Sequence, residues 1–381
     1  MHKKLNPVSM KKANKKIILR YLIEKGQGSR MEIVRKTGLA QSAVWRLVNE
    51  LESDNLIEEK GFAPGKRRKS VIYGPTKSFV TSVIYNVEVL ETLVAIGFLD
   101  GSWQIFERFS TPSTFESFKE KAKTSLEKIQ KKLSFKDGIT KVVFSLPGIV
   151  NYDKKFLIYA PNLKWKNIDF QKAFEDIEVE VFVENDANLA LMAEQFFSDD
   201  VKKAKVAFFL YFGEGIGGAI SVDGNIVRGK NSAAGEIGHV MFDGKNREIE
   251  RFLSILELTS KTQKWLEGNN NHSLSEKFQH LKRLWFAGQK DVQKILKDYL
   301  YHVGVVLRNI IYLLNPDVIV LGGLINDIYD TFGPVIKNKI DKDIAKEIVE
   351  GIRIRDTIFR DVPPSLVGGN VLVIDHFLKN L

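Results

Sequence analysis

Apolar residues recur at helical spacing in three short runs near the start of the chain, at 17–22, 31–34 and 44–51. This spacing predicts three short amphipathic helices, because residues three and four apart share one face of a helix. Ser29 followed by Glu32 has the form of a capping box for the second helix, and Gly38 supplies the positive φ that ends it. A tight turn before the third helix completes the layout of a helix-turn-helix.

Two short strands are predicted after the third helix, at 56–60 and 70–74. They flank a glycine-turned hairpin loop that carries Lys66, Arg67, Arg68 and Lys69. A cationic hairpin beside a helix-turn-helix is typical of a wing. We therefore predict a winged helix-turn-helix domain over residues 1–75.

The excess positive charge of the chain lies in this first segment. Residues 1–78 contain 18 Lys and Arg against 7 Asp and Glu, a net charge of +11, whereas the remaining 303 residues contain 39 basic and 40 acidic residues. A solvated basic tail is the alternative, but such tails lack apolar periodicity. A basic domain on a neutral body predicts a polyanionic partner, and double-stranded operator DNA is the partner that suits a winged helix.

The first residues of the third helix are the candidates for reading the DNA sequence. Gln41, Ser42, Ala43 and Arg46 would face the major groove, where Gln and Arg make bidentate contacts with base edges. The wing cations would instead contact phosphates or the minor groove. Because one winged helix binds DNA weakly, we expect a homodimer or higher homo-oligomer on two half-sites.

The chain contains no cysteine, which excludes disulfides and thiolate metal sites and is typical of a reducing compartment. No apolar run reaches membrane-spanning length, and the basic start lacks a following apolar secretory core. We expect a cytoplasmic protein with no membrane partner.

The rest of the chain alternates predicted strands with predicted helices, which indicates an α/β fold with mixed sheets in two lobes. Strands are predicted at 80–89, 93–99, 141–146, 179–183, 206–211, 219–222 and 318–321, and helices at 114–133, 187–197, 248–265 and 291–314. We expect a second domain at 79–381, with lobes at about 79–186 and 187–365. The C-terminal helix is a candidate to return to the first lobe.

Glycine-rich turns follow two of the predicted strands. The turn from Gly213 to Gly218 exposes backbone N–H groups that could cradle a phosphate. Glu214 would repel such an anion, so a tight turn between two closely paired strands is an alternative of at least equal weight. The pair Gly322 and Gly323, at the end of the strand 318–321, is uninformative alone.

Two polar clusters are more specific. Asn185 and Asp186 close a strand and open a helix, where Asp186 is either a helix N-terminal acid or a general base. Glu236 and His239 lie three residues apart between glycines. A carboxylate and an imidazole suit the vicinal hydroxyls of a sugar, because the carboxylate accepts hydrogen bonds and neutral imidazole both donates and accepts.

Taken together, these segments resemble the ROK family, which comprises sugar-responsive transcriptional repressors and sugar kinases. The matching segments are 145–148, 160–165, 184–188, 193–194, 213–218, 234–239 and 321–323, with Gly224 and Gly229. ROK repressors carry an N-terminal winged helix and ROK kinases generally do not, so the two parts of the chain agree.

The resemblance implies an actin-like, ribonuclease-H-like fold of two lobes with a sugar in the cleft. The sugar ligands that it implies are Asn162, Asn185, Asp186, Glu236 and His239, with the backbone near Gly148 lining the pocket. The acid that follows the family's cysteine loop falls at Glu250, after a loop that is shorter here. In a ROK kinase Asp186 would be the catalytic base.

Three departures from the family pattern concern the nucleotide and the metal. The phosphate motif Asp-x-Gly-x-Thr is replaced by Asn86-Val87-Glu88-Val89-Leu90, which has no glycine and no hydroxyl. Glu214 replaces a small hydroxyl residue of the second phosphate loop. The family's zinc site pairs the histidine at His239 with three cysteines that this chain lacks, so we expect no zinc and no other metal.

These departures predict a degenerate nucleotide site, formed by Asn86, Gly213, Glu214, Gly215, Gly217, Gly322 and Gly323. Phosphoryl transfer depends on positioning and charge neutralisation, which this set supplies poorly. We interpret the body as a sugar sensor with a sugar effector and no other cofactor. The alternative is an active sugar kinase of glucokinase or N-acetylglucosamine kinase type, which would need ATP and magnesium.

Overall fold

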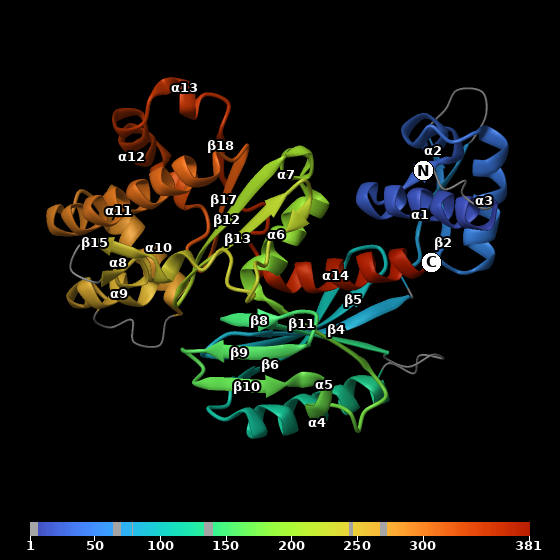
Figure 1. Ribbon diagram of the computed structural model, residues 1–381, viewed down its shortest axis with the longest axis horizontal. Helices are drawn as coiled ribbons and strands as arrows, with labels where there is room; N and C mark the ends of the chain where they lie inside the picture. The colour runs from blue at the N-terminus through green and yellow to red at the C-terminus, as the bar shows by residue number, and fades with distance from the viewer. Residues whose placement is uncertain (1–6, 64–69, 78, 133–139, 244–246, 267–272) are drawn as a thin grey trace. The chain divides into compact units, whose positions relative to one another are not determined.

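The computed structural model describes residues 7–63, 70–77, 79–132, 140–243, 247–266 and 273–381 (Figure 1). The chain forms two compact units. The first comprises Met1–Phe144, Gln171–Phe182 and Gly369–Leu381, and the second comprises Ser145–Phe170 and Val183–Gly368. Among the described residues, no helix combines the length and the apolar character needed to cross a bilayer.

The first unit begins with the predicted helix-turn-helix and wing strands. Its elements are α1 (Pro7–Lys25), β1 (Gly28–Ser29), α2 (Arg30–Thr37), α3 (Gln41–Ser53), β2 (Ile57–Ala63) and β3 (Ser70–Pro75). The capping box is confirmed, because the Ser29 N–H donates to Glu32 Oε2 at 2.8 Å and the Glu32 N–H donates to Ser29 Oγ at 3.3 Å. Gly38 ends α2 with φ 70°, as predicted from its position.

The three helices pack around one apolar core, which includes the fully buried side chains of Ile18, Leu22, Ile33, Val44 and Leu47. The wing strands pair antiparallel, and β1 joins them in the order β1-β3-β2. The wing cations Lys66, Arg67, Arg68 and Lys69 lie outside the described residues.

A five-stranded sheet in the order β11-β7-β4-β5-β6 follows the winged helix. Its strands are β4 (Val80–Val87), β5 (Glu91–Phe98), β6 (Trp103–Ser110), β7 (Lys141–Leu146) and β11 (Glu180–Asn185). The helix α4 (Phe115–Lys132) packs on it through Phe118, whose ring lies 6.4 Å from that of Tyr85 between centroids. Asn370 of α14 (Pro364–Asn380) donates to the Phe98 carbonyl at 3.0 Å.

The second unit is built on a mixed sheet in the order β14-β13-β12-β17-β18. Its strands are β12 (Val206–Phe212), β13 (Ile216–Val222), β14 (Asn225–Ile226), β17 (Val318–Gly323) and β18 (Arg353–Asp356). The strand β12 pairs antiparallel with β13 and parallel with β17, and β17 pairs parallel with β18. The predicted α/β class with mixed sheets is therefore confirmed.

Helices cover both faces of this sheet, with α6 (Asp186–Phe197) on one face and α11 (Lys290–Leu314) and α12 (Ile328–Asp343) on the other (Figure 1). Successive side chains of a strand point to opposite faces. Phe209 accordingly packs in the cluster that contains Ala187 and Ala190 of α6, whereas Phe208 and Leu210 pack in the cluster of α11 and α12. This burial explains why the central strands are continuous apolar runs.

The helix expected over 248–265 is three shorter helices, and this expectation was wrong. Ser254 adopts an extended conformation with ψ 145° and accepts a hydrogen bond from the Glu257 N–H at 3.3 Å, so it caps a new helix. The pieces are α8 (Glu250–Leu253), α9 (Ile255–Lys261) and the 3₁₀ helix η2 (Gln263–Trp265).

The remaining elements are short or peripheral. A three-stranded sheet in the order β10-β9-β8, which the sequence did not predict, belongs to the second unit. The bounds are β8 (Ile149–Asn151), β9 (Phe156–Ala160), β10 (Trp165–Asp169), α5 (Phe170–Ala173), α7 (Asp199–Lys203), η1 (Ile237–His239), β15 (Met241–Asp243), β16 (Arg247–Glu248), α10 (Leu274–Phe286) and α13 (Lys346–Val349).

A glycine in α14 allows that helix to approach α6. A Cβ atom at Gly368 would lie 1.8 Å from the carbonyl oxygen of Leu189, whereas one at Gly333 in α12 would meet nothing closer than 3.5 Å. We predict that Gly368→Ala lowers the free energy of unfolding by about 2 kcal/mol or more. Gly333→Ala should cost well under half of that, because its Cβ meets no close contact beyond the ring of the following Pro334, and alanine has a higher helix propensity than glycine.

Chemical denaturation of the two variants measures this difference. Equal stabilities for Gly368→Ala and Gly333→Ala would contradict the close approach of α14 to α6.

Candidate functional site

The site residues of the second unit gather around the loop between β12 and β13. Phe212 pairs with Ile216, and the Gly213 N–H donates to the Gly215 carbonyl at 2.8 Å, so residues 213–215 form a short hairpin loop. This geometry favours the tight turn over the phosphate cradle. A Cβ atom at Gly215 would lie 2.3 Å from Glu250 Oε2 and 3.3 Å from Asn162 Nδ2. Glycine is required there because these two side chains occupy the space.

Glu250 is held on this loop by the backbone. It begins α8, and its Oε2 accepts a hydrogen bond from the Ile216 N–H at 2.9 Å. Asn162, which is exposed, lies in the turn between β9 and β10. The structure thus brings Asn162 and Glu250 to one place, although 88 residues separate them in the chain.

Glu236 and His239 lie at the start and end of the segment that forms η1. The preceding Gly235 has φ 93°, and a Cβ atom there would lie 2.4 Å from the carbonyl oxygen of Gly218, so this segment packs directly on β13. Burial raises the pKa of Glu236, the neighbouring His239 ring opposes that rise, and the negative charge of Glu250 adds to it. Glu236, His239 and Glu250 therefore share one electrostatic environment.

His239 is the most accessible of these side chains, with 47% of it exposed. Its Nδ1 lies 3.5 Å from Glu248 Oε1. The donor set does not fit the zinc site that the resemblance implies, because the chain has no cysteine and the described residues contain no group of three His, Asp or Glu side chains placed to hold a metal ion.

The start of α6 orders the other predicted ligands. Asn185 is the N-cap, since its Oδ1 accepts from the Asn188 N–H at 3.0 Å, and its Nδ2 donates to the Gly148 carbonyl at 3.0 Å. Asp186 is the first residue of the helix and accepts from the Ala187 N–H at 2.8 Å. Asp186 is therefore a helix N-terminal acid, one of the two roles that the sequence leaves open for it, whereas Asn185 makes the capping bond.

One charged contact beside these ligands was not predicted. Arg228 donates to Glu184, which directly precedes Asn185, and the two residues lie 44 positions apart. A glutamate at the end of an apolar strand signals that a cation must be near, but the sequence does not identify which one.

The predicted nucleotide residues are divided between the two units. Asn86, on β4 of the first unit, is 1% exposed, and its Nδ2 donates to Glu88 Oε1 at 3.2 Å. In the second unit, a Cβ atom at Gly322 would lie 2.5 Å from the ring of Phe209, and one at Gly323 would lie 2.1 Å from the Phe212 carbonyl oxygen. Close packing of β17 on β12 is sufficient to explain these two glycines.

Three further residues were assigned to the same nucleotide set. A Cβ atom at Gly213 would lie 2.6 Å from the ring of Tyr211, whereas one at Gly217 would meet nothing closer than 3.7 Å. Glu214 is half-buried in the hairpin loop.

The candidate DNA-reading residues lie on the first turns of α3. Gln41, Ser42 and Arg46 are exposed, and Ala43 is half-buried. Within the described part of the chain, Arg46 takes part in no ion pair. The acidic residues of α3, Glu50 and Glu52, lie at its other end, where Glu50 and the C-cap residue Asp54 pair with lysines of α1.

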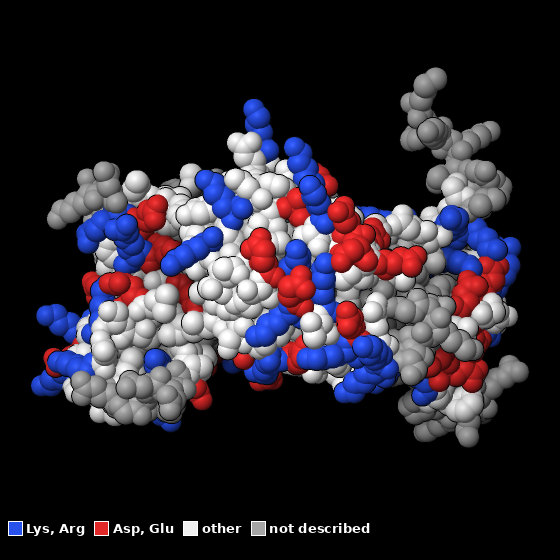
Figure 2. All heavy atoms as spheres, turned by 90° about the horizontal axis from the view of Figure 1, so that it is seen from below, with Lys and Arg blue, Asp and Glu red and all other residues white. Residues whose placement is uncertain are grey.

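The charge of the rest of the protein is mixed. Figure 2 shows basic and acidic side chains interspersed over the visible face of the protein. Residues 79–381 have a net charge near zero, with 39 basic and 40 acidic residues.

Comparison with known proteins covers both parts of the chain. The ROK family profile matches residues 85–368, and a profile described as winged helix-turn-helix DNA-binding matches residues 12–58. A xylose repressor from Lactiplantibacillus pentosus is 22% identical over 362 residues, 91% of each chain. A glucokinase from Halalkalibacterium halodurans is 26% identical over 314 residues, which is 75% of this chain and 93% of the kinase.

A solved structure has the same fold over nearly the full length. It is a ROK family transcriptional regulator described as a homolog of the E. coli MLC protein, with a TM-score of 0.75 at 17% identity. The match covers 97% of this chain and 98% of that one.

The buried acid Glu236 predicts a stability that depends on pH. Because the folded pKa is raised above the unfolded value near 4.3, this carboxyl favours folding at low pH, and the benefit is lost as pH rises through the folded pKa. Glu236→Gln removes the buried charge. We expect it to stabilise the protein at pH 7.5 by ~1 kcal/mol, about 2–4 °C in Tm, and to give no gain at pH 4.

Differential scanning calorimetry at the two pH values measures this difference. The same change in Tm at both would show that Glu236 titrates as an ordinary exposed acid.

Proposed function

Because this chain belongs to the ROK family and carries a winged helix-turn-helix before its ROK domain, we propose that it is a sugar-responsive transcriptional repressor. The observation that carries the proposal is the presence of both parts in one chain. The match to the xylose repressor spans 91% of this chain, which is more than the ROK domain alone supplies.

Sequence-specific DNA binding is assigned to α3. Its exposed Gln41 and Arg46 have the functional groups that discriminate bases in the major groove. The acids Glu50 and Glu52 lie in the last turn of α3, and Glu50 is paired with Lys11 and Lys15 of α1. The first turn of this helix contains no acidic residue. A homodimer would present two such helices to an operator of two half-sites.

Effector binding is assigned to the cluster at the β12–β13 loop. The carboxylates of Glu236 and Glu250 accept hydrogen bonds, and the side-chain amide of Asn162 both accepts and donates. The imidazole of His239 can donate or accept, and Asp186 adds a carboxylate at the start of α6. Such groups suit adjacent sugar hydroxyls. D-Xylose is the first candidate effector, because several relatives over most of the chain are named xylose repressors.

Loss of kinase activity is supported by the residues at the nucleotide positions. In the first unit, Asn86 donates a hydrogen bond to Glu88 where the family has a glycine-hydroxyl phosphate motif. In the second unit, Glu214 stands where the family's other phosphate loop has a small hydroxyl residue. A triphosphate needs donors and cations there. The retained Asp186 favours the alternative of an active sugar kinase, but a sensor also needs this carboxylate to bind a hydroxyl.

We assign the coupling between effector binding and DNA binding to a shift in the equilibrium between two conformations of the protein. The helix α14 begins in the second unit at Pro364 and ends in the first unit, where Asp375 pairs with Arg20 of α1. Sugar must favour one state by about 2 kcal/mol or more to switch operator occupancy strongly. We expect the sugar-bound state to release DNA.

A DNA-binding experiment separates sequence reading from charge attraction. Arg46→Ala should cost about 1–3 kcal/mol on the preferred duplex and reduce its preference over unrelated duplexes. Lys66→Ala should weaken binding to all duplexes and reduce the salt dependence. Fluorescence anisotropy at several salt concentrations measures both, and an unchanged preference in Arg46→Ala would remove α3 from the reading role.

A ligand screen tests the effector assignment. Thermal denaturation with D-xylose, D-glucose and N-acetylglucosamine should identify a sugar that stabilises the protein by about 2.7 kcal/mol at one hundred times its Kd. Glu236→Ala and His239→Ala should lose this response while remaining folded. ATP- and magnesium-dependent phosphorylation of that sugar would contradict the sensor and establish the kinase.

A further inference from the structure

A fully buried carboxylate lies directly before the start of α6. Glu184 is 0% exposed, and burial of a charge is costly unless it is paired and hydrogen bonded. Its Oε1 accepts from the Asn185 N–H at 2.9 Å and from Asn188 Nδ2 at 3.0 Å. Its Oε2 accepts from Arg228 Nε at 2.8 Å and from Arg228 Nη2 at 2.6 Å. Both oxygens are therefore satisfied, and one residue supplies the neutralising charge.

Arg228 also contacts two other segments. Its guanidinium lies over the ring of Tyr152, 4.6 Å from the centroid, and Tyr152 directly follows β8. The Arg228 carbonyl accepts from the Ala234 N–H at 3.1 Å, which closes the loop that leads into η1. One side chain and its own backbone thus join the end of β11, the β8–β9 turn and the η1 segment.

Asn185 and Asp186 lie where β11 meets α6, and Glu236 and His239 lie in the η1 segment, whereas Gly148 lies at the other end of β8 from Tyr152. We propose that Arg228 is a positioning residue for the sugar site, a role that rests on the sugar-binding function proposed above. Through its contacts with Glu184 and Tyr152, Arg228 fixes the distances between these segments, so that their side chains can contact one sugar molecule together.

Arginine has the shape that this role requires. Its planar guanidinium donates from two nitrogens to one carboxylate and places its face against a ring at the same time. Lysine keeps the charge but offers a single ammonium group and no planar face. Arg228→Lys should therefore keep Glu184 neutralised while loosening the three segments.

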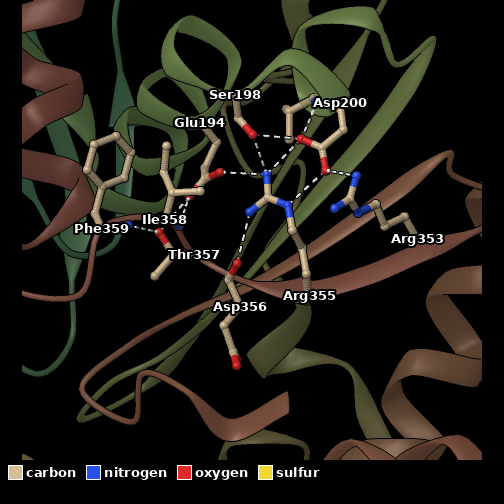
Figure 3. Close-up of polar contacts among 10 residues, drawn as sticks. Glu194, Ser198, Asp200, Arg353, Arg355, Asp356, Thr357, Ile358 and Phe359 are labelled. Atoms are coloured by element: carbon tan, nitrogen blue, oxygen red, sulfur yellow. Dashed lines mark hydrogen bonds and ion pairs between the residues drawn. The ribbon is translucent and has the colours of Figure 1, made fainter. Parts of the chain in front are cut away.

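The opposing explanation is that Arg228 only neutralises Glu184, and a second buried pair provides the matched control. Glu194, near the other end of α6, is also 0% exposed and accepts from Arg355 Nη2 at 2.8 Å (Figure 3). Arg355 also binds Asp200, whose pKa it holds well below the usual range. Figure 3 shows this cluster around β18 and the segment that follows it, which carries none of the candidate sugar ligands.

Isothermal titration of the full-length chain with D-xylose and with D-glucose tests the proposal. Arg228→Lys should raise the Kd of the sugar that binds by at least about tenfold, whereas Arg355→Lys should leave it within about twofold of the wild-type value. Tyr152→Leu, which removes only the ring face, should also raise the Kd. An unchanged Kd in Arg228→Lys would overturn the positioning role.

A double variant separates position from stability. Arg228→Met leaves Glu184 as a buried unpaired charge and should lower the Tm, and adding Glu184→Gln should recover the Tm because no buried charge remains. The positioning role predicts that the Kd stays raised in the double variant. Recovery of the Kd together with the Tm would mean a purely structural role, and absence of binding of both sugars to the wild type would reject the proposed effector function itself.

Discussion

The site depends on how helix α6 is fixed against the sheet of the second unit. Small side chains at Ala187 and Ala190 let the helix lie close to β12 and β13, and both are fully buried. Glu184 lies two residues before the helix, where Arg228 neutralises its buried charge. Packing and paired charge therefore determine where Asp186 lies before any ligand binds, and such preorganisation reduces the entropy lost on binding.

Local signals explain why the first part of the chain could be predicted closely. The capping box of Ser29 and Glu32 and the helix end at Gly38 depend only on residues a few positions apart, and both are present. The central strands β12 and β17 were predicted because burial on both faces requires an apolar residue at every position. The break at Ser254 was missed because its capping bond competes with a helix that the periodicity also allows.

Long-range contacts explain what could not be predicted. The pairing of Arg228 with Glu184 spans 44 positions, and the contact of Glu250 with the backbone of Ile216 spans 34. Neither follows from periodicity, since each depends on how the loop after β14 and the start of α8 fold back on β13. The candidate ligands were named by a family resemblance, whereas the contacts that hold them in place come from the structure.

The carboxylates Glu236 and Glu250 affect both the stability of the fold and the proposed sugar site. Glu236 is buried beside Glu250 at a cost to the folded state, which is the kind of strain that binding sites retain. A ligand that donates hydroxyl hydrogens to these acids relieves it.

The central claim is that sugar occupancy and operator binding are coupled in one chain, and thermodynamic linkage tests it most directly. The Kd for a fluorescent operator duplex is measured with and without saturating sugar, and the Kd for the sugar is measured with and without saturating duplex. We predict that each ligand weakens the other by the same factor, at least about tenfold. Equal affinity for the duplex with and without the bound sugar would contradict the account.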